Sequence, residues 1–272
     1  GVDRGLETQQ PFTVGQIKEE LKRIEEGKVG LLVPDPLKLP PGKIVGLESD
    51  PDLELIYVLG RGTVLGDGPK PQNILNEESF RQFIAPGWIS LVHYQREQLD
   101  QAAPMHGLGY FDLPQDLSPS SIVLTDNQLY VSAKGYDFPH ISTLYENQVH
   151  LLVYERESRL PGEGSEEQLD SKDRDILFSL PLPLDSAPRK MIAKDGLLFI
   201  DGQSQGILVV SIADPERPVI ISKIKQGNRA GVTTNLSVSD FSVVGDRLII
   251  TNPRRTKISS FAESFTFDIS KP

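Results

Sequence analysis

Three stretches of the chain align without a gap, and each has the pattern of a β-hairpin. They are residues 122–131, 191–200 and 241–250, and apolar or β-branched residues fill both arms at strand length. Their central pairs are Asp126-Asn127, Asp195-Gly196 and Gly245-Asp246. Such residues tolerate the positive φ that a two-residue turn of the primed type requires. The stretches start 69 and then 50 residues apart, near the period of a propeller blade, so they predict a repeating all-β architecture.

Further strand patterns follow each hairpin. A third strand is expected at 149–155, 206–212 and 264–269, and a fourth at 175–180 and 218–224. An earlier, less regular unit has strands at 43–47, 55–59, 88–94 and 107–112, with an insertion around Asp50-Pro51-Asp52. Four antiparallel strands per repeat make a blade. We therefore predict an all-β fold, a β-propeller or partial propeller of four-stranded antiparallel blades near 43–113, 120–181, 188–225 and 238–272.

The first residues of the chain have the pattern of a short helix. Apolar residues recur at helical spacing within 13–27, Thr13 and Gln16 form a capping box, and Gly27 provides a stop. We expect an N-terminal helical segment at 1–28 and the repeat domain at 29–272. The helix either packs on the β body or binds a partner or a membrane surface, and its mixed charges argue against the membrane. Because the chain begins without Met, we take it for a piece of a longer protein, and its last blade either gains a closing strand from the N-terminal segment or continues into a longer array.

Residues 197–221 carry a second motif, in which a strand, a Gly turn and a Leu-Val-rich strand lead into an Asp-Pro exit. Asp214, Pro215 and Pro218 form that exit, and residues 268–272 begin the same pattern again. Asp214 is suited to accept hydrogen bonds from turn amides, and the two prolines fix φ and end the pairing. The segment resembles the bacterial LVIVD repeat. The resemblance implies a β-propeller within a large exported or surface-attached bacterial protein, and no defined reaction.

Composition excludes several kinds of partner. The chain has 38 acidic and 28 basic residues and no basic run, so we expect no nucleic-acid partner. No apolar run reaches the roughly 18 to 20 residues of a membrane span, so we expect no membrane insertion. The chain has no cysteine, which removes disulfides, thiolate metal sites and cysteine nucleophiles.

Candidate chemistry is sparse. His93, His106, His140 and His150 form no pair at metal-binding spacing, so we predict no metal site and no cofactor. Residues 61–68 are glycine-rich but lack the Lys-Ser/Thr ending of a phosphate loop. His140, close to Asp137 in an aromatic loop, is the best placed of the histidines. We predict no catalytic residue.

The connections between second and third strands vary most in length: 61–87, 134–148, 203–205 and 253–263. They should emerge on one face, opposite the long segment 156–174, and variable loops on a constant scaffold usually bind. The predicted contact residues are aromatic or imidazole side chains of the two longest connections: Phe80, Phe83, Tyr136, Phe138 and His140.

We therefore expect a non-enzymatic binding or scaffold module of a larger exported bacterial protein, secreted or at the cell surface, that presents these loops to a protein or glycan. The alternative is a hydrolase or lyase whose active site lies at the propeller mouth. Its carboxylates would be Asp67, Asp137 and Asp201. An enzyme of this kind would bring two or more acidic residues together with an Arg or His.

Overall fold

In the computed structural model, the described residues are 39–62, 84–94, 106–136, 145, 147–158, 174–229, 232–255 and 260–270. They fold into antiparallel sheets, with a single-turn 3-10 helix, η3 (Gln203–Gln205), as their helical element. The prediction of an all-β fold built from four-stranded antiparallel sheets is confirmed. The predicted helix at 13–27 lies outside the described residues. No helix of membrane-spanning length and hydropathy occurs in the described part of the chain.

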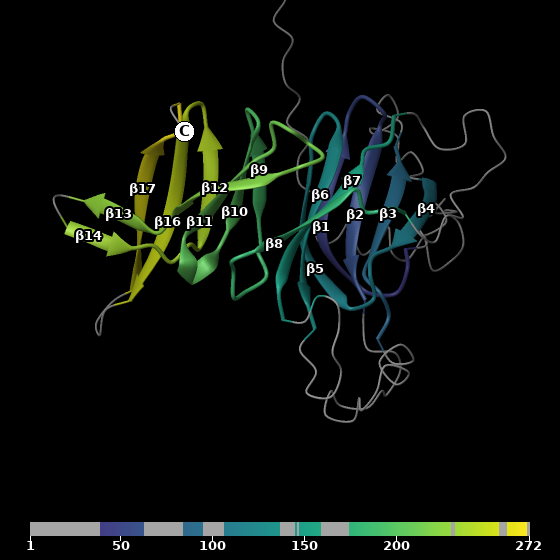
Figure 1. Cartoon of the computed structure of the whole chain (residues 1–272), viewed down its shortest axis with the longest axis horizontal. Coiled ribbons are helices and arrows are strands. Elements are labelled where there is room, and N and C mark those ends of the chain that lie inside the picture. The colour runs from purple at the N-terminus through teal and green to yellow at the C-terminus, as the bar shows by residue number, and fades with distance from the viewer. Residues whose placement is uncertain are drawn as a thin grey trace, which may run out of the picture. The chain divides into compact units, whose positions relative to one another are not determined.

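Among the described residues, four sheets of three or four strands follow one another along the chain, and each runs up and down in sequence order (Figure 1). Sheet 1 contains β1 (Lys43–Asp50), β2 (Leu55–Arg61), β3 (Trp88–His93) and β4 (His106–Asp112). Sheet 2 contains β5 (Leu117–Leu124), β6 (Gln128–Gly135), β7 (Val149–Glu155) and β8 (Phe178–Leu182). Sheet 3 contains β9 (Met191–Lys194), β10 (Leu197–Asp201), β11 (Ile207–Ser211) and β12 (Val219–Ile224). Sheet 4 contains β15 (Asp240–Val244), β16 (Arg247–Arg255) and β17 (Ser260–Asp268).

All three hairpins are confirmed, but their turns differ. The Asp195-Gly196 turn has φ values of 49° and 75°, as a type I′ turn requires. In the Gly245-Asp246 turn, Gly245 has a positive φ of 55°, and Asp246 does not have a positive φ. At Asp126-Asn127 the expectation of positive φ is wrong. The Thr125 amide donates to the Gln128 carbonyl at 2.9 Å, but the Gln128 amide donates at 3.2 Å to the Thr125 hydroxyl instead of the Thr125 carbonyl.

Apolar layers separate consecutive sheets. Cluster 1 lies between sheets 1 and 2, cluster 2 between sheets 2 and 3, and cluster 3 between sheets 3 and 4. Leu129, Leu198 and Leu248 occupy the same column of the three hairpins, and each is fully buried in the layer shared with the preceding sheet. The first strands of consecutive sheets also contact one another, β1 with β5, β5 with β9 and β9 with β15. The hairpins are therefore equivalent in packing as well as in sequence.

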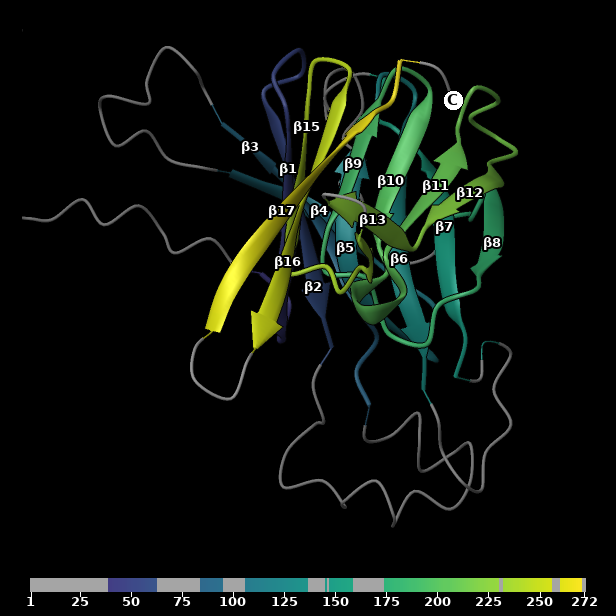
Figure 2. The same ribbon diagram turned by 90° about the vertical axis from the view of Figure 1, so that its left-hand side faces the viewer.

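Two features of the C-terminal part were not predicted. The β16–β17 hairpin pairs out to Arg255 and Ser260, so the expected connection at 253–263 is wrong (Figure 2). Pro253 is accommodated there because β15 stops pairing at Thr251, which leaves one side of β16 without a strand partner among the described residues. A separate hairpin of β13 (Gln226–Arg229) and β14 (Val232–Asn235) precedes sheet 4, and a side chain at Gly227 would collide with Phe265.

The outer face of sheet 4, which points away from cluster 3, is polar. It carries three rows of paired residues: Asp240, Thr251 and Ser264; Ser242, Ile249 and Thr266; Val244, Arg247 and Asp268. Most of these side chains are exposed, and Val244 is 61% exposed. Sheet 4 therefore buries one face, whereas sheet 2 contributes apolar residues to the layers on both of its faces.

Candidate functional site

The connections between strands lie at two opposite edges of the sheets. We call the edge that carries the first-to-second and third-to-fourth strand connections the turn edge. The opposite edge, which carries the second-to-third strand connections and the linkers between sheets, is the loop edge. Because every sheet runs up and down, these connections alternate between the two edges.

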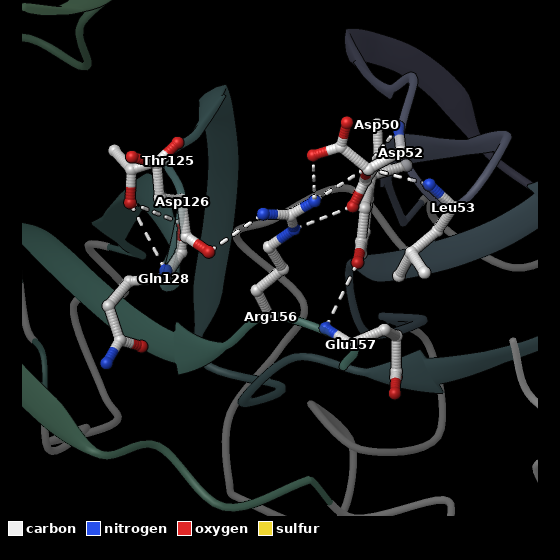
Figure 3. A network of polar contacts seen from close by, with 9 residues as sticks. Asp50, Asp52, Leu53, Thr125, Asp126, Gln128, Arg156 and Glu157 are labelled. Carbon is white, nitrogen blue, oxygen red and sulfur yellow. Dashed lines mark hydrogen bonds and ion pairs between the residues drawn. The ribbon is translucent and has the colours of Figure 1, made fainter. Parts of the chain in front are cut away.

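A buried ion pair joins sheets 1 and 2 at the turn edge (Figure 3). Asp50 ends β1 and is fully buried, and Arg156 directly follows β7. The Arg156 Nε and Nη2 atoms donate to Asp50 Oδ2 and Oδ1, each at 2.7 Å. The amides of Asp52 and Leu53 also donate to Asp50 Oδ1, at 3.1 and 3.2 Å. This bidentate geometry is the strong form of an arginine–carboxylate pair.

The environment of Asp50 favours its charged form. Burial alone would raise the pKa of Asp50, but the hydrogen bond from Arg156, the Leu53 amide, the Arg156 charge and the Asp52 amide together lower it. The same pairing raises the pKa of Arg156. Both groups are therefore ionised at neutral pH, and their charges compensate each other.

All three guanidinium nitrogens of Arg156 donate to acceptors within the protein. Its Nη1 donates to the Asp126 carbonyl at 2.8 Å, its Nη2 also contacts Asp52 at 3.3 Å, and its own amide donates to the Asn127 carbonyl at 3.2 Å. The arginine thus holds the first connection of sheet 1 against the first turn of sheet 2. This arrangement is a structural clamp between neighbouring sheets.

Two clefts lie along the turn edge beside this clamp. A cleft of about 540 Å³ runs over sheets 1 and 2, and one of about 370 Å³ lies between the turns of sheets 2 and 3. The lining of the larger cleft is acidic, with Asp52, Asp126, Glu155, Glu157 and Glu216. Within the described ranges, no group of three or more His, Cys, Asp or Glu residues is placed to hold a metal ion.

At the loop edge, the bases of the two longest connections lie side by side. Arg61, at the start of the first connection, donates through Nε and Nη2 to the Pro119 carbonyl at 3.2 and 3.1 Å. Gln115 Nε2 donates to the Ile84 carbonyl, at the end of the same connection, at 2.7 Å. The amide of Tyr136, where the second connection begins, donates to the Asp116 carbonyl at 3.1 Å. The linker between sheets 1 and 2 therefore fastens both connections at adjacent points.

Of the predicted contact residues, the structure describes Tyr136. Its side chain is half-buried. Burial raises the pKa of Tyr136, and a hydrogen bond from Ser118 and the charge of Arg61 offset only part of this rise. Phe80, Phe83, Phe138 and His140 lie outside the described residues, so their clustering with Tyr136 stays a prediction.

The carboxylates of the enzymatic alternative are not brought together in the described part of the chain. Asp201 is 2% exposed; it accepts hydrogen bonds from the Gln203 amide at 2.7 Å and from Arg189 Nε at 3.0 Å. Arg189 continues to the Val238 carbonyl at 2.8 Å, so Asp201 holds the linkers of sheets 3 and 4. Asp67 and Asp137 lie outside the described residues.

The sequence did not reveal the Asp50–Arg156 clamp, because the two residues are far apart in the chain. The one available signal was the polar Asp50-Pro51-Asp52 insertion, which interrupts the first hairpin. An Asp followed by Pro commonly starts a turn in which the Asp side chain accepts backbone amides, as Asp50 does here.

Comparisons with known proteins do not name a family. No family model matches the chain, and no curated protein matches it. Among solved structures, the chain is similar to the computationally designed Ika8 protein with a TM-score of 0.34 and 9% identity, over 83% of this chain and 58% of the designed one. The chain thus matches less than two thirds of that protein's length, and a likeness of this size assigns neither fold nor function.

Proposed function

We propose that this chain is a non-enzymatic binding module in which a propeller-type repeat scaffold presents the long connections of its loop edge to a protein or glycan. The observation that carries the proposal is the fastening of both connections at adjacent points by Arg61, Gln115 and Tyr136. Two long connections that start side by side are well placed to contact one ligand. Binding loops on rigid scaffolds are built in this way.

The packing supports a partial propeller as the scaffold. First strands of consecutive sheets contact one another, and equivalent leucines fill each layer, as in an array of blades. The polar outer face of sheet 4 favours a partial array over a closed ring, because a further blade packs best on an apolar face. The resemblance of residues 197–221 to the LVIVD repeat supports a place within a larger exported bacterial protein, secreted or at the cell surface.

Binding is favoured over hydrolase or lyase chemistry by the state of two of the three buried acidic groups of the described residues, the third being Glu263. Asp50 and Asp201 are the buried aspartates of the described residues, and both accept backbone amides and pair with an arginine. Groups held in this way position connections and linkers rather than transfer protons. The enzymatic alternative requires free carboxylates that converge with an Arg or His.

The test is to shorten the connections separately and measure binding. Residues 63–83 in one variant and 137–144 in another are replaced by short Gly-Ser linkers, and each protein is screened on a glycan array and on a library of displayed peptides. We expect both variants to lose the ligand that the unaltered chain selects, while the melting temperature stays within a few degrees. The matched control shortens 159–173, which leaves from the turn edge, and it should bind as the unaltered chain does.

Equal binding by all variants would contradict the proposal. Unfolding of either loop-edge variant would show that these connections support the scaffold rather than a ligand. A ligand found on the glycan array or in the peptide library would distinguish the two classes of partner.

A further inference from the structure

His150 lies beneath the root of the second long connection, on β7 at the loop edge. It is 7% exposed and is paired across the sheet with Ala133 of β6. Its Nδ1 atom is 3.1 Å from the Ser179 hydroxyl of β8. Its Nε2 atom is buried and has no hydrogen-bond partner. A buried polar atom without a hydrogen-bond partner is uncommon in a folded protein and calls for a specific explanation.

The Tyr145 ring covers this imidazole. The two ring centroids are 4.8 Å apart and the planes meet at 78°, an edge-to-face arrangement. The Tyr145 side chain also hydrogen-bonds Ser179 and packs against cluster 1. Ser179 therefore bridges Tyr145 and His150.

Tyr145 also fixes the backbone on which the connection closes. Its carbonyl accepts the Gln148 amide at 3.1 Å, and the Gln148 carbonyl accepts the Gly135 amide at 2.8 Å. A side chain at Gly135 would collide with the Tyr145 carbonyl, so the ends of β6 and β7 are closely apposed here. Displacing Tyr145 would open its own hydrogen bond to the Gln148 amide, and the Gly135–Gln148 hydrogen bond lies directly beside it.

The charges around His150 are few. Burial lowers the pKa of His150, and the Asp116 carboxylate of the linker opposes this shift. Tyr145 is the titratable group on the turn before β7, and burial raises its pKa so that it stays neutral. On β8, Ser179 is uncharged, and on β6 the Lys134 Nζ donates to the Asp185 carbonyl instead. His150 is accordingly neutral at pH 7. In its protonated form both ring nitrogens carry a hydrogen, and the Nε2–H group would have no acceptor.

We propose that His150 is an acid-sensitive latch, whose protonation displaces Tyr145 from cluster 1 and opens the hydrogen bonds of Gln148 and Gly135. The inference deepens the proposed function. Only one consequence rests on that function, namely that ligand binding at the loop edge changes with pH. The latch itself concerns described residues and is measured without any ligand. Because the folded-state pKa of His150 is lowered, the native state binds fewer protons than the open state, and opening becomes easier as pH falls below about 6.5.

The test follows amide hydrogen exchange of the full chain from pH 7.5 to 5, corrected for intrinsic exchange. We expect protection of the Gln148 and Gly135 amides to fall about tenfold for each unit by which the His150 pKa is lowered. The Asp201 amide, which donates to the Lys190 carbonyl at the same edge, should keep its protection. In His150→Gln, which cannot titrate, the protection of Gln148 should not change with pH. Ser179→Ala keeps the imidazole and should retain the pH response.

Two results would overturn the latch. In the first, an NMR titration of the unaltered chain shows that His150 becomes protonated, but the protection of the Gln148 amide does not change over the same pH range. The other is the same pH-dependent loss in His150→Gln. Failure of the loop-shortening experiment alone would remove the proposed function and leave the latch standing, since exchange is measured without ligand.

Discussion

Sheets 2 and 4 begin with equivalent hairpins but differ in their second face. In β7 of sheet 2 the run from Val149 to Tyr154 is buried on both sides. In sheet 4 the strands alternate, with Phe241, Leu248 and Phe265 toward cluster 3 and exposed polar residues such as Thr266 on the outer face. A continuous apolar run suits a sheet covered on two faces, and alternation suits one covered on a single face.

The difference shows what the repeated hairpin determines. Its inward column, Leu129 and Leu248, fixes how a sheet packs on the preceding one. The opposite column decides whether another sheet can follow. Sequence similarity between repeats therefore predicts the first contact of each sheet, while the second contact depends on residues that the alignment does not constrain.

The largest expected effect comes from the inward column. Leu129→Ala in sheet 2 and Leu248→Ala in sheet 4 should each reduce the free energy of unfolding by about 3 to 5 kcal/mol, because both side chains are fully buried. Denaturant unfolding measures both. A cost below about 1 kcal/mol for Leu248→Ala would show that the two hairpins are not equivalent in packing.

The junctions between sheets provide the second comparison. Asp50→Asn should lower the free energy of unfolding by about 3 kcal/mol. This value is near the lower end for a broken buried ion pair, because 16% of the Arg156 side chain is exposed and water can solvate its charge. The matched control is Asp240→Asn in sheet 4, whose pair with Lys190 is exposed and should contribute less than about 1 kcal/mol. Equal costs would mean that the Asp50 clamp is not a special feature of the junction between sheets 1 and 2.

The Asp50 clamp also has a pH signature. Since the folded-state pKa of Asp50 lies below its unfolded value, its stabilisation is fully present above the unfolded pKa of about 4. It is lost as pH falls through the lower folded-state pKa. The difference in unfolding free energy between the unaltered chain and Asp50→Asn should therefore shrink below about pH 4. A constant difference down to pH 2 would contradict the lowered pKa.

Local patterns predicted much of the fold. The strands of sheets 1 to 3 and all three hairpins followed from apolar runs bounded by turn residues, because these signals act over a few residues. The β13–β14 hairpin was missed, since Gln226–Arg229 lacks the apolar residues of a typical strand. The long β16–β17 pairing was missed because Pro253 normally ends a strand, and its tolerance depends on where β15 stops.

The candidate site was less predictable, because its contacts join distant parts of the chain. No local signal pairs Asp50 with Arg156, or Arg61 with the Pro119 carbonyl. Tyr136 was selected as an aromatic loop residue, and the structure places it at the root of its connection. The sequence placed His150 among four histidines without metal-binding spacing and gave no signal that its Nε2 atom would be buried without a hydrogen-bond partner. Whether a buried imidazole is fully bonded depends on tertiary neighbours that sequence spacing does not contain.

A smaller effect is expected at the turns. Gly196→Val should destabilise the chain by about 1 to 2 kcal/mol, because Gly196 has a φ of 75° that β-branched residues avoid. In sheet 2, Asn127→Val is the matched control, and it should cost less because Asn127 has no positive φ. Thermal unfolding at one pH compares the two. Equal losses would indicate that turn conformation does not distinguish the hairpins.

The smallest effect is expected on the outer face of sheet 4. Thr266→Val keeps a β-branched side chain on an exposed strand position and should change the free energy of unfolding by no more than about 0.5 kcal/mol. The matched control is Ser132→Val in sheet 2, where the fully buried hydroxyl lies 3.0 Å from Ser120 Oγ, and its loss should cost about 1 to 3 kcal/mol. Denaturant unfolding, together with sedimentation to follow association, measures both. A change above about 1 kcal/mol for Thr266→Val, or a new dimer, would mean that this face is covered, and sheets 2 and 4 would then differ in sequence but not in packing.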